Sequence, residues 1–326
     1  MENYRISYIV TTYNKLPYLQ QVLGRLVAAR QPDEEIVVAD GGSKDGTPEY
    51  LRGLFEAGQI QQFVSERDKG ESHGFNKCML MARGELLKFI TDDDAFCYPA
   101  IRQAADFMIA NPQVDVMSGE TWMTDLDNLA YFAFYKWSLD HFELWRSTSK
   151  PGTMVGLPTI IRRSSLALTG LLNTNVAQPD GEFFLRITSL KANIAWMTNV
   201  LSVRIENPQS NARNMQSEVI ESEVERMVFF HDKGVQHDLV YYLRAKSKLV
   251  KILKKPLTPI KRFIQNKVAK PSDDIRVPSN YVSLAGEDRL IAAFRICDEF
   301  MAAQNASKKA EFLYTENLIK KVALTT

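Results

Sequence analysis

The stretch LLKFITDDD, residues 86–94, decides the fold class, because an apolar run of strand length ends in three adjacent carboxylates. A buried strand that ends in polar residues is typical of parallel sheets, which bind ligands at the carboxyl ends of their strands. An isolated acidic triplet is more commonly a solvated turn. The segments on either side of the stretch decide between these two interpretations.

Further apolar runs upstream also end in polar clusters, at Thr11–Asn14, Asp40–Ser43 and Glu66–Asp68. Helix-like segments separate the runs, and this alternation predicts βαβ units and an α/β fold with a mostly parallel, Rossmann-like mixed sheet flanked by helices. The expected strands are 5–10, 35–39, 61–65, 86–91 and 114–118, and the expected helices are 16–30, 47–57, 71–83, 99–110 and 180–191.

Length and composition fit one large domain with an appendage. The 326 residues are 45% apolar and 24% charged, which is ordinary for a globular protein with a sizeable core. We expect a catalytic α/β domain over 1–215 and a helical C-terminal region over 216–326. Three widely spaced cysteines predict a reducing compartment. No secretory signal and no run of 18 apolar residues is visible, so we expect a cytoplasmic protein.

The acidic triplet also carries a chemical prediction. Adjacent carboxylates repel one another unless a cation lies between them, and one or two carboxylates commonly hold a diphosphate-bound Mg²⁺ or Mn²⁺. The sequence contains neither a Walker-type phosphate loop nor a GxGxxG motif. This argues against a nucleoside triphosphatase and against a dinucleotide-dependent oxidoreductase.

Four segments taken in order resemble the inverting family 2 glycosyltransferases with the GT-A fold, of the bacterial surface-polysaccharide type. They are TTYNK (11–15), VVADGGSKDGT (37–47), the long run from Ser65 to Asp94, and DGEFFLRI (180–187). The resemblance covers about residues 5–210. It implies a nucleotide-diphospho-sugar donor, with a UDP-sugar as the first candidate, and a glycan or lipid-linked glycan acceptor.

The resemblance also implies roles for individual residues. The acidic triplet would play the part of the DxD motif, which holds the metal and the ribose, although a triplet leaves the register ambiguous by one residue. The predicted metal ligands are Asp92, Asp93 and Asp94. The predicted nucleotide- and sugar-binding residues are Thr11, Tyr13, Asp40, Asp68, Lys69, Asn76, Asp92 and Asp93.

The family's catalytic base is an aspartate at the start of a short helix, and Asp180 falls at that position. Asp180 also suits the cap of that helix, so a purely structural role stays open. Glu182 is the possible second acid. Glu206 stands where many members have a histidine, which leaves the contact made by that histidine in question.

The segment 239–272 contains ten Lys or Arg residues and no acidic residue. It is either a solvated helical face or a peripheral contact with the anionic inner face of the cell membrane. Nucleic acid is not the expected partner, because no groove of stacking aromatic residues accompanies the charge.

The resemblance predicts a metal-dependent inverting glycosyltransferase of bacterial polysaccharide or lipopolysaccharide synthesis. Two alternatives are a sugar nucleotidylyltransferase and a non-catalytic glycan- or nucleotide-binding subunit that retains the fold. The sequence does not indicate the sugar, the base of the nucleotide, the acceptor or the linkage.

Overall fold

The computed structural model describes residues 4–210, residues 223, 227 and 231, and the ranges 275–280 and 286–314. The basic segment 239–272 lies outside the described residues. In the described part of the chain, no helix is long and apolar enough to cross a membrane.

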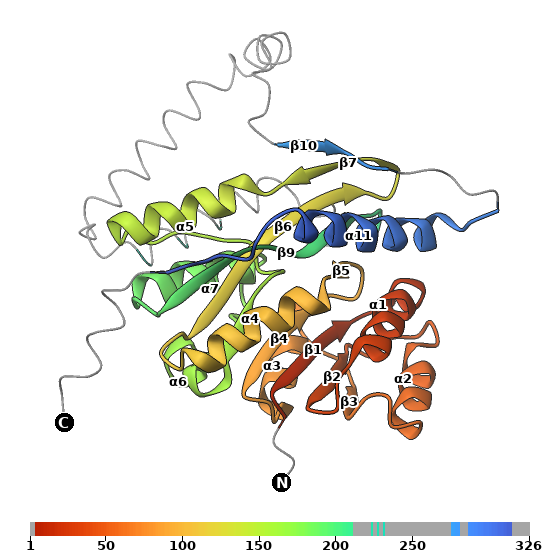
Figure 1. The fold of residues 1–326 in the computed structure, drawn as a ribbon. Helices are drawn as coiled ribbons and strands as arrows, with labels where there is room; N and C mark the ends of the chain where they lie inside the picture. The colour runs from red at the N-terminus through yellow and green to blue at the C-terminus, as the bar shows by residue number, and fades with distance from the viewer. Residues whose placement is uncertain are drawn as a thin grey trace, which may run out of the picture.

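A single mixed sheet forms the centre of the molecule (Figure 1). Its strand order is β10-β7-β6-β8-β4-β1-β2-β3, with β9 beside β6 and with β5 and β11 paired to β9. The strands are β1 (Ile6–Thr12), β2 (Glu34–Asp40), β3 (Gln62–Ser65), β4 (Leu86–Ile90), β5 (Ala95–Phe96), β6 (Val116–Asp125), β7 (Asn128–Phe134), β8 (Ile160–Arg162), β9 (Ile194–Glu206), β10 (Arg276–Pro278) and β11 (Phe312–Leu313).

Helices cover both faces of this sheet. The helices are α1 (Leu16–Ala29), α2 (Thr47–Glu56), α3 (Glu71–Met81), α4 (Tyr98–Ala110), α5 (Lys136–Thr148), α6 (Leu166–Thr169), α7 (Pro179–Ser189) and α11 (Arg289–Ala306), with a 3₁₀ turn at Arg163–Ser165. One apolar cluster packs α1, α2, α4 and α11 onto the sheet, and a second packs α3, α5 and α7 onto the other face. The predicted α/β class with flanking helices is confirmed.

Strand β1 shows why its sequence is apolar at nearly every position. Tyr8 and Val10 point into the first cluster, whereas Ile9 points into the second, and all three are fully buried. A parallel strand covered by helices on both faces must be apolar on both faces.

The parallel register brings several strand ends to one edge of the sheet. Thr12 at the end of β1 pairs with Asp40 at the end of β2, and Val10 pairs with Ile90 at the end of β4. The polar clusters that follow these strands therefore lie together.

The described elements of the C-terminal region join the same sheet. β10 pairs antiparallel with β7, and β11 pairs antiparallel with β9. Helix α11 packs against β9, β5 and α1, and Figure 1 shows it in blue alongside β6 and β9. Asp288 caps this helix by accepting hydrogen bonds from the backbone N–H groups of Leu290 and Ile291.

Candidate active site

A cavity of about 340 Å³ opens at the carboxyl ends of β1, β2 and β4. Its walls come from the segments that follow β1, β2, β3 and β4, as expected for a parallel sheet. The lining residues are Thr11, Thr12, Tyr13, Lys15, Gly41, Arg67, Asp68, Gly70, Glu71, Thr91 and Asp92.

Four of the predicted binding residues line this cavity: Thr11, Tyr13, Asp68 and Asp92. Tyr13 keeps 59% of its surface exposed, which leaves an aromatic face open to a planar ligand. Asp68 is fixed by a 2.8 Å hydrogen bond from the backbone N–H of Gly70. A side chain at Gly41 would begin only 3.0 Å from a carboxylate oxygen of Asp68, so glycine allows the β2 loop to approach this wall.

Two other predicted binding residues lie behind the cavity. Asp40 is fully buried and accepts hydrogen bonds from the hydroxyls of Ser43 and Ser65, and it holds the loop that carries Gly41. Asn76 donates to the carbonyl of Leu172 and accepts from its N–H, so it joins α3 to the segment before α7. Both side chains support the walls of the cavity and are absent from its lining.

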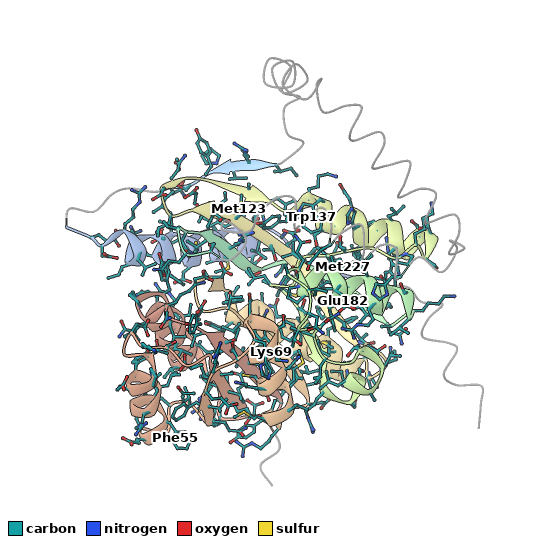
Figure 2. All side chains as sticks on the ribbon, turned by 180° about the vertical axis from the view of Figure 1, so that it is seen from behind. Phe55, Lys69, Met123, Trp137, Glu182 and Met227 are labelled. Carbon is teal, nitrogen blue, oxygen red and sulfur yellow. The ribbon has the colours of Figure 1, made fainter. Side chains whose placement is uncertain are left out.

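Lys69, another predicted binding residue, is exposed and is also absent from the lining of the cavity. Figure 2 labels it near the centre of the view, below Glu182 and Met227.

The acidic triplet divides between two directions. Asp92 lines the cavity, and Asp93 lies beside it, where it accepts a 3.0 Å hydrogen bond from the Asn207 amide. Asp94 is directed toward β9: its two oxygens accept hydrogen bonds from the backbone N–H of Ile205 and the hydroxyl of Thr91. The ambiguity of register is thus reduced to Asp92 and Asp93 as the acids nearest the cavity.

Lys15 neutralises the two acids nearest the cavity. Its Nζ lies 2.7 Å from Oδ2 of Asp93 and 3.4 Å from Oδ1 of Asp92. Burial lowers the pKa of Lys15, but the carboxylates of Asp92 and Asp93 raise it by more, so the ammonium stays charged.

Burial and repulsion between neighbouring carboxylates make ionisation of Asp92 and Asp94 less favourable. Burial first, and then the charge of Asp93, raise the pKa of Asp92 to about 7, although Lys15 acts in the opposite direction. The same two causes raise the pKa of Asp94 to about 7, against the hydrogen bonds from Thr91 and Ile205. A further cation at these carboxylates would favour their ionised forms.

The triplet fits a divalent cation only in part. Asp92 and Asp93 are placed to ligate one, whereas Asp94 is occupied by protein donors. Among the described residues, no group of three or more His, Cys, Asp and Glu side chains is arranged to hold a metal. Asp92 and Asp93 are the two acids of the triplet on the cavity side, and one or two carboxylates is the number that Mg²⁺ commonly takes when substrate phosphates supply other ligands.

Asp180 lies in the first turn of α7. The helix begins at Pro179 with Gln178 as its cap, and the Asp180 carboxylate accepts a 2.8 Å hydrogen bond from the N–H of Gly181. Gly156 packs directly against it, since a side chain there would begin 2.7 Å from Cβ of Asp180. The residue as a whole is exposed, yet protein surrounds its carboxyl group, and this burial raises the pKa of the Asp180 carboxyl.

Arg204 on β9 acts through its charge on both Asp180 and the acidic triplet. It lowers the pKa of both Asp180 and Asp94 by its charge. Its guanidinium donates to the Tyr135 hydroxyl and pairs with Glu206 at 2.6 Å. Glu206 therefore holds this arginine.

Glu182 does not share the position of Asp180. Its carboxylate is buried and pairs with Arg186 at 3.0 Å, and it lies 3.4 Å from Nε2 of His231. Figure 2 shows Glu182 beside Met227. These contacts make Glu182 a partner of Arg186 within the same helix.

Sequence reasoning missed Lys15 and Arg204 as components of the site. Lys15 could have been identified, because it follows the first strand at the same edge of the sheet as the triplet. Arg204 carries no local signal, since its position depends on the long strand β9.

Comparison with known proteins identifies the domain. Residues 7–167 match the model of glycosyl transferase family 2. The chain carries a family 2 glycosyltransferase domain. A glycosyltransferase of a Nostoc species is 26% identical over 114 residues, which are 35% of each chain. The poly-beta-1,6-N-acetyl-D-glucosamine synthase of Staphylococcus epidermidis is 24% identical over 185 residues, 54% of this chain and 43% of the relative.

Solved structures show that the family 2 domain has the GT-A fold. Residues 1–349 of TarS of S. aureus, in complex with UDP-GlcNAc, are similar with a TM-score of 0.53 and 16% identity, over 72% of this chain and 69% of that TarS fragment. The mannosyltransferase PcManGT from Pyrobaculum calidifontis, in complex with GDP-Man and Mn²⁺, is similar with a TM-score of 0.50 and 18% identity, over 82% and 88% of the two chains. The aligned stretch spans less than half the length of the Nostoc and Staphylococcus epidermidis relatives.

Proposed function

We propose that this protein transfers a sugar from a nucleoside-diphosphate sugar to an acceptor hydroxyl, with inversion at the anomeric carbon, in the synthesis of a bacterial surface polysaccharide. The proposal is carried by two sites whose carboxyl groups, Asp94 in the triplet and Asp180, are both close enough to Arg204 to be affected by its charge. One is a cavity with an open aromatic face and a carboxylate–ammonium cluster, and the other is the Asp180 carboxylate. The curated relatives and the similar structures, which include complexes with UDP-GlcNAc and GDP-Man, support a nucleotide-sugar donor.

The cavity suits the nucleotide part of such a donor. Tyr13 offers a face on which a base can stack, and Asp68 offers acceptor oxygens for hydroxyl groups of the donor. Lys15 and Arg67 supply positive charge within the same walls, which favours a diphosphate. A UDP-sugar is the first candidate.

The proposed reaction is one in-line displacement. Asp180 removes the proton of the acceptor hydroxyl, whose oxygen then attacks the anomeric carbon as the bond to the diphosphate oxygen breaks. A raised pKa suits this role, because it makes the ionised Asp180 a stronger base than an ordinary carboxylate. Arg204 stabilises the ionised form.

A divalent cation would be held by Asp92 and Asp93, and when bound it would offset the charge that develops on the leaving diphosphate. If so, EDTA should weaken binding of a nucleoside diphosphate, and Asp92→Ala together with Asp93→Ala should abolish transfer. Full transfer by the double variant would refute the assignment of these residues.

The test of the base is Asp180→Asn. Asparagine keeps the size of the side chain and can still accept from the N–H of Gly181, so the fold and the donor affinity should change little. It cannot take a proton at neutral pH, so turnover at saturating donor and acceptor should fall by roughly 10² to 10⁴.

The matched control for Asp180→Asn is Glu182→Gln, the same chemical change two residues along the same helix. Near-normal turnover is expected from this variant, because Glu182 faces Arg186. Near-normal turnover of Asp180→Asn would remove Asp180 from the mechanism, and a collapse confined to Glu182→Gln would transfer the role to Glu182.

The basic segment 239–272 supports a peripheral site on an anionic membrane. Under this proposal the protein sediments with vesicles that contain anionic lipid, and less so as salt rises above physiological strength. Equal binding to neutral and anionic vesicles, or binding to neither, would favour the alternative that the segment is a solvated helical face.

A further inference from the structure

The ammonium of Lys15 occupies the side of the acidic pair that faces the cavity. It contacts Oδ2 of Asp93 at 2.7 Å and Oδ1 of Asp92 at 3.4 Å, and Lys15 and Asp92 both line the cavity. The exposed fractions of these side chains are 12% for Lys15, 9% for Asp92 and 11% for Asp93, so water screens the contacts poorly.

The backbone fixes the position of this lysine. Lys15 is the residue immediately before α1, and its carbonyl accepts the N–H of Leu19. The next residue, Leu16, donates its N–H to the carboxylate of Asp45. The side chain therefore starts from a rigid helix end at the edge of the sheet where the two aspartates lie, and its ammonium reaches them without movement of the backbone.

We infer that Lys15 is a resident counter-cation of Asp92 and Asp93, and that a divalent cation can bind this pair only by displacing it. The inference rests on the proposed function, because the metal belongs to the donor chemistry. Lys15 already contacts one oxygen of each carboxylate, and a divalent cation bound to the same pair would be repelled by the ammonium at close range. Lys15 thus acts as a positioning residue that holds the two carboxylates in place before the metal and the donor arrive.

Displacement has a consequence for the donor. Since Lys15 lines the same cavity, its released ammonium is available to a diphosphate bound there. Metal and diphosphate should then strengthen each other's binding, because the metal releases the Lys15 ammonium from the aspartates and the diphosphate pairs with that ammonium.

The test is the affinity for Mn²⁺ alone, without donor or acceptor, measured by calorimetry and by the electron paramagnetic resonance of free Mn²⁺. Lys15→Met removes the competing charge and should tighten Mn²⁺ binding roughly tenfold or more. The matched control is Arg67→Met, which removes one positive charge from the same cavity. Because no ion pair joins Arg67 to Asp92 or Asp93 among the described contacts, it should change the affinity by less than about threefold.

A second variant covers the chance that Lys15→Met does not fold. Lys15→Arg keeps the charge and should keep Mn²⁺ binding as weak as in the parent protein. Four results would overturn the inference. Lys15→Met could bind Mn²⁺ with the affinity of the parent, or Arg67→Met could bind Mn²⁺ as tightly as Lys15→Met does. Lys15→Arg could bind Mn²⁺ more tightly than the parent, or none of the proteins could bind Mn²⁺.

These outcomes are separable from the proposed transfer. Sugar transfer by the parent protein with an unchanged Mn²⁺ affinity in Lys15→Met would refute the inference alone. Tighter Mn²⁺ binding by Lys15→Met in a protein that transfers no sugar from any nucleotide-sugar would refute the proposed function alone.

Discussion

Gly156→Ala should move the proposed base without changing its chemistry. Gly156 lies against Asp180, and a new Cβ would begin 2.7 Å from Cβ of Asp180, closer than two such carbons approach in folded proteins. Ordinary contact begins at 3.4 Å, so one of the two residues must shift by about 0.7 Å. Gly156 is not in the left-handed region of the backbone, so the clash with Asp180 is the main effect.

The expected loss follows from the geometry of proton transfer. A displacement of about 1 Å in a reacting group can lower the rate on the order of 10²-fold. We therefore expect kcat to fall by roughly 10- to 100-fold. The strain of the added methyl group should cost about 1 to 3 kcal/mol of unfolding free energy. Donor affinity should be nearly unchanged, because Gly156 does not line the nucleotide cavity.

The assay is release of the nucleoside diphosphate at saturating donor and acceptor, together with the donor Kd and the melting temperature. The control is Gly152→Ala in the same loop. There the new Cβ would lie 3.6 Å from the carbonyl oxygen of His141, an ordinary contact, so near-normal turnover is expected.

Two results would refute this reasoning. A folded Gly156→Ala protein with kcat within about threefold of the parent would show that the position of Asp180 does not limit the reaction. An equal loss in Gly152→Ala would show that the whole loop is sensitive, independent of contact with Asp180.

Three further predictions concern the titratable groups of Asp180, Lys88 and Glu182. Burial raises the pKa of Asp180, and a base acts only when it is ionised. As the pH is lowered, kcat/KM should therefore decline with a midpoint above 3.8, the usual pKa of an aspartate, and a midpoint below pH 3.8 would contradict this. Lys88 is fully buried with its ammonium on the Leu157 carbonyl, and burial lowers its pKa, so Lys88→Met should melt at a higher temperature at pH 7. That gain should shrink toward pH 10.5, where the unfolded lysine also loses its proton, and thermal melts at the two pH values test both parts. Glu182→Gln should lose about 1 to 3 kcal/mol in urea unfolding, since the partly buried Arg186 loses its charged partner, while turnover stays near normal; unchanged stability would show that the pair contributes nothing.

The first half of the sheet could be predicted from the sequence because each signal is local. The expected strands 35–39 and 86–91 correspond to β2 (Glu34–Asp40) and β4 (Leu86–Ile90), and the expected helix 71–83 corresponds to α3 (Glu71–Met81). Each is an apolar run or a helical period bounded by glycine or polar residues. Such patterns record burial directly.

The second half could not be predicted in the same way. β9 is a strand of 13 residues whose partners are β5, β6 and β11, and its pairing with β6 shifts register between Gly119 and Thr121. Pairing between distant segments leaves no local period, and an irregular register breaks the period of two that identifies a strand.

The same limit applies within the site. The location of the triplet at a ligand-binding edge follows from the strand before it. Which partner each carboxylate takes does not, because Asp94 turns toward the backbone of Ile205 and Asp93 toward Lys15 and Asn207. Those choices depend on how β9 lies beside the β4 loop.

The way in which the chain completes its sheet has a consequence for synthesis on the ribosome. β1, β2, β3 and β4 can pair soon after they emerge, and β9 can pair with the earlier strands β5 and β6, but its contacts with α11 and β11 wait for residues made much later. The N–H of Glu311 bonds the hydroxyl of Thr198 across 113 residues, and the side chain of Asn305 bonds the backbone of Val200 across 105. Until α11 emerges, a nascent chain exposes the apolar surface that this helix covers and an unpaired edge of β9, both of which favour aggregation. The time spent translating the segment between β9 and α11 therefore sets how long the chain depends on chaperones.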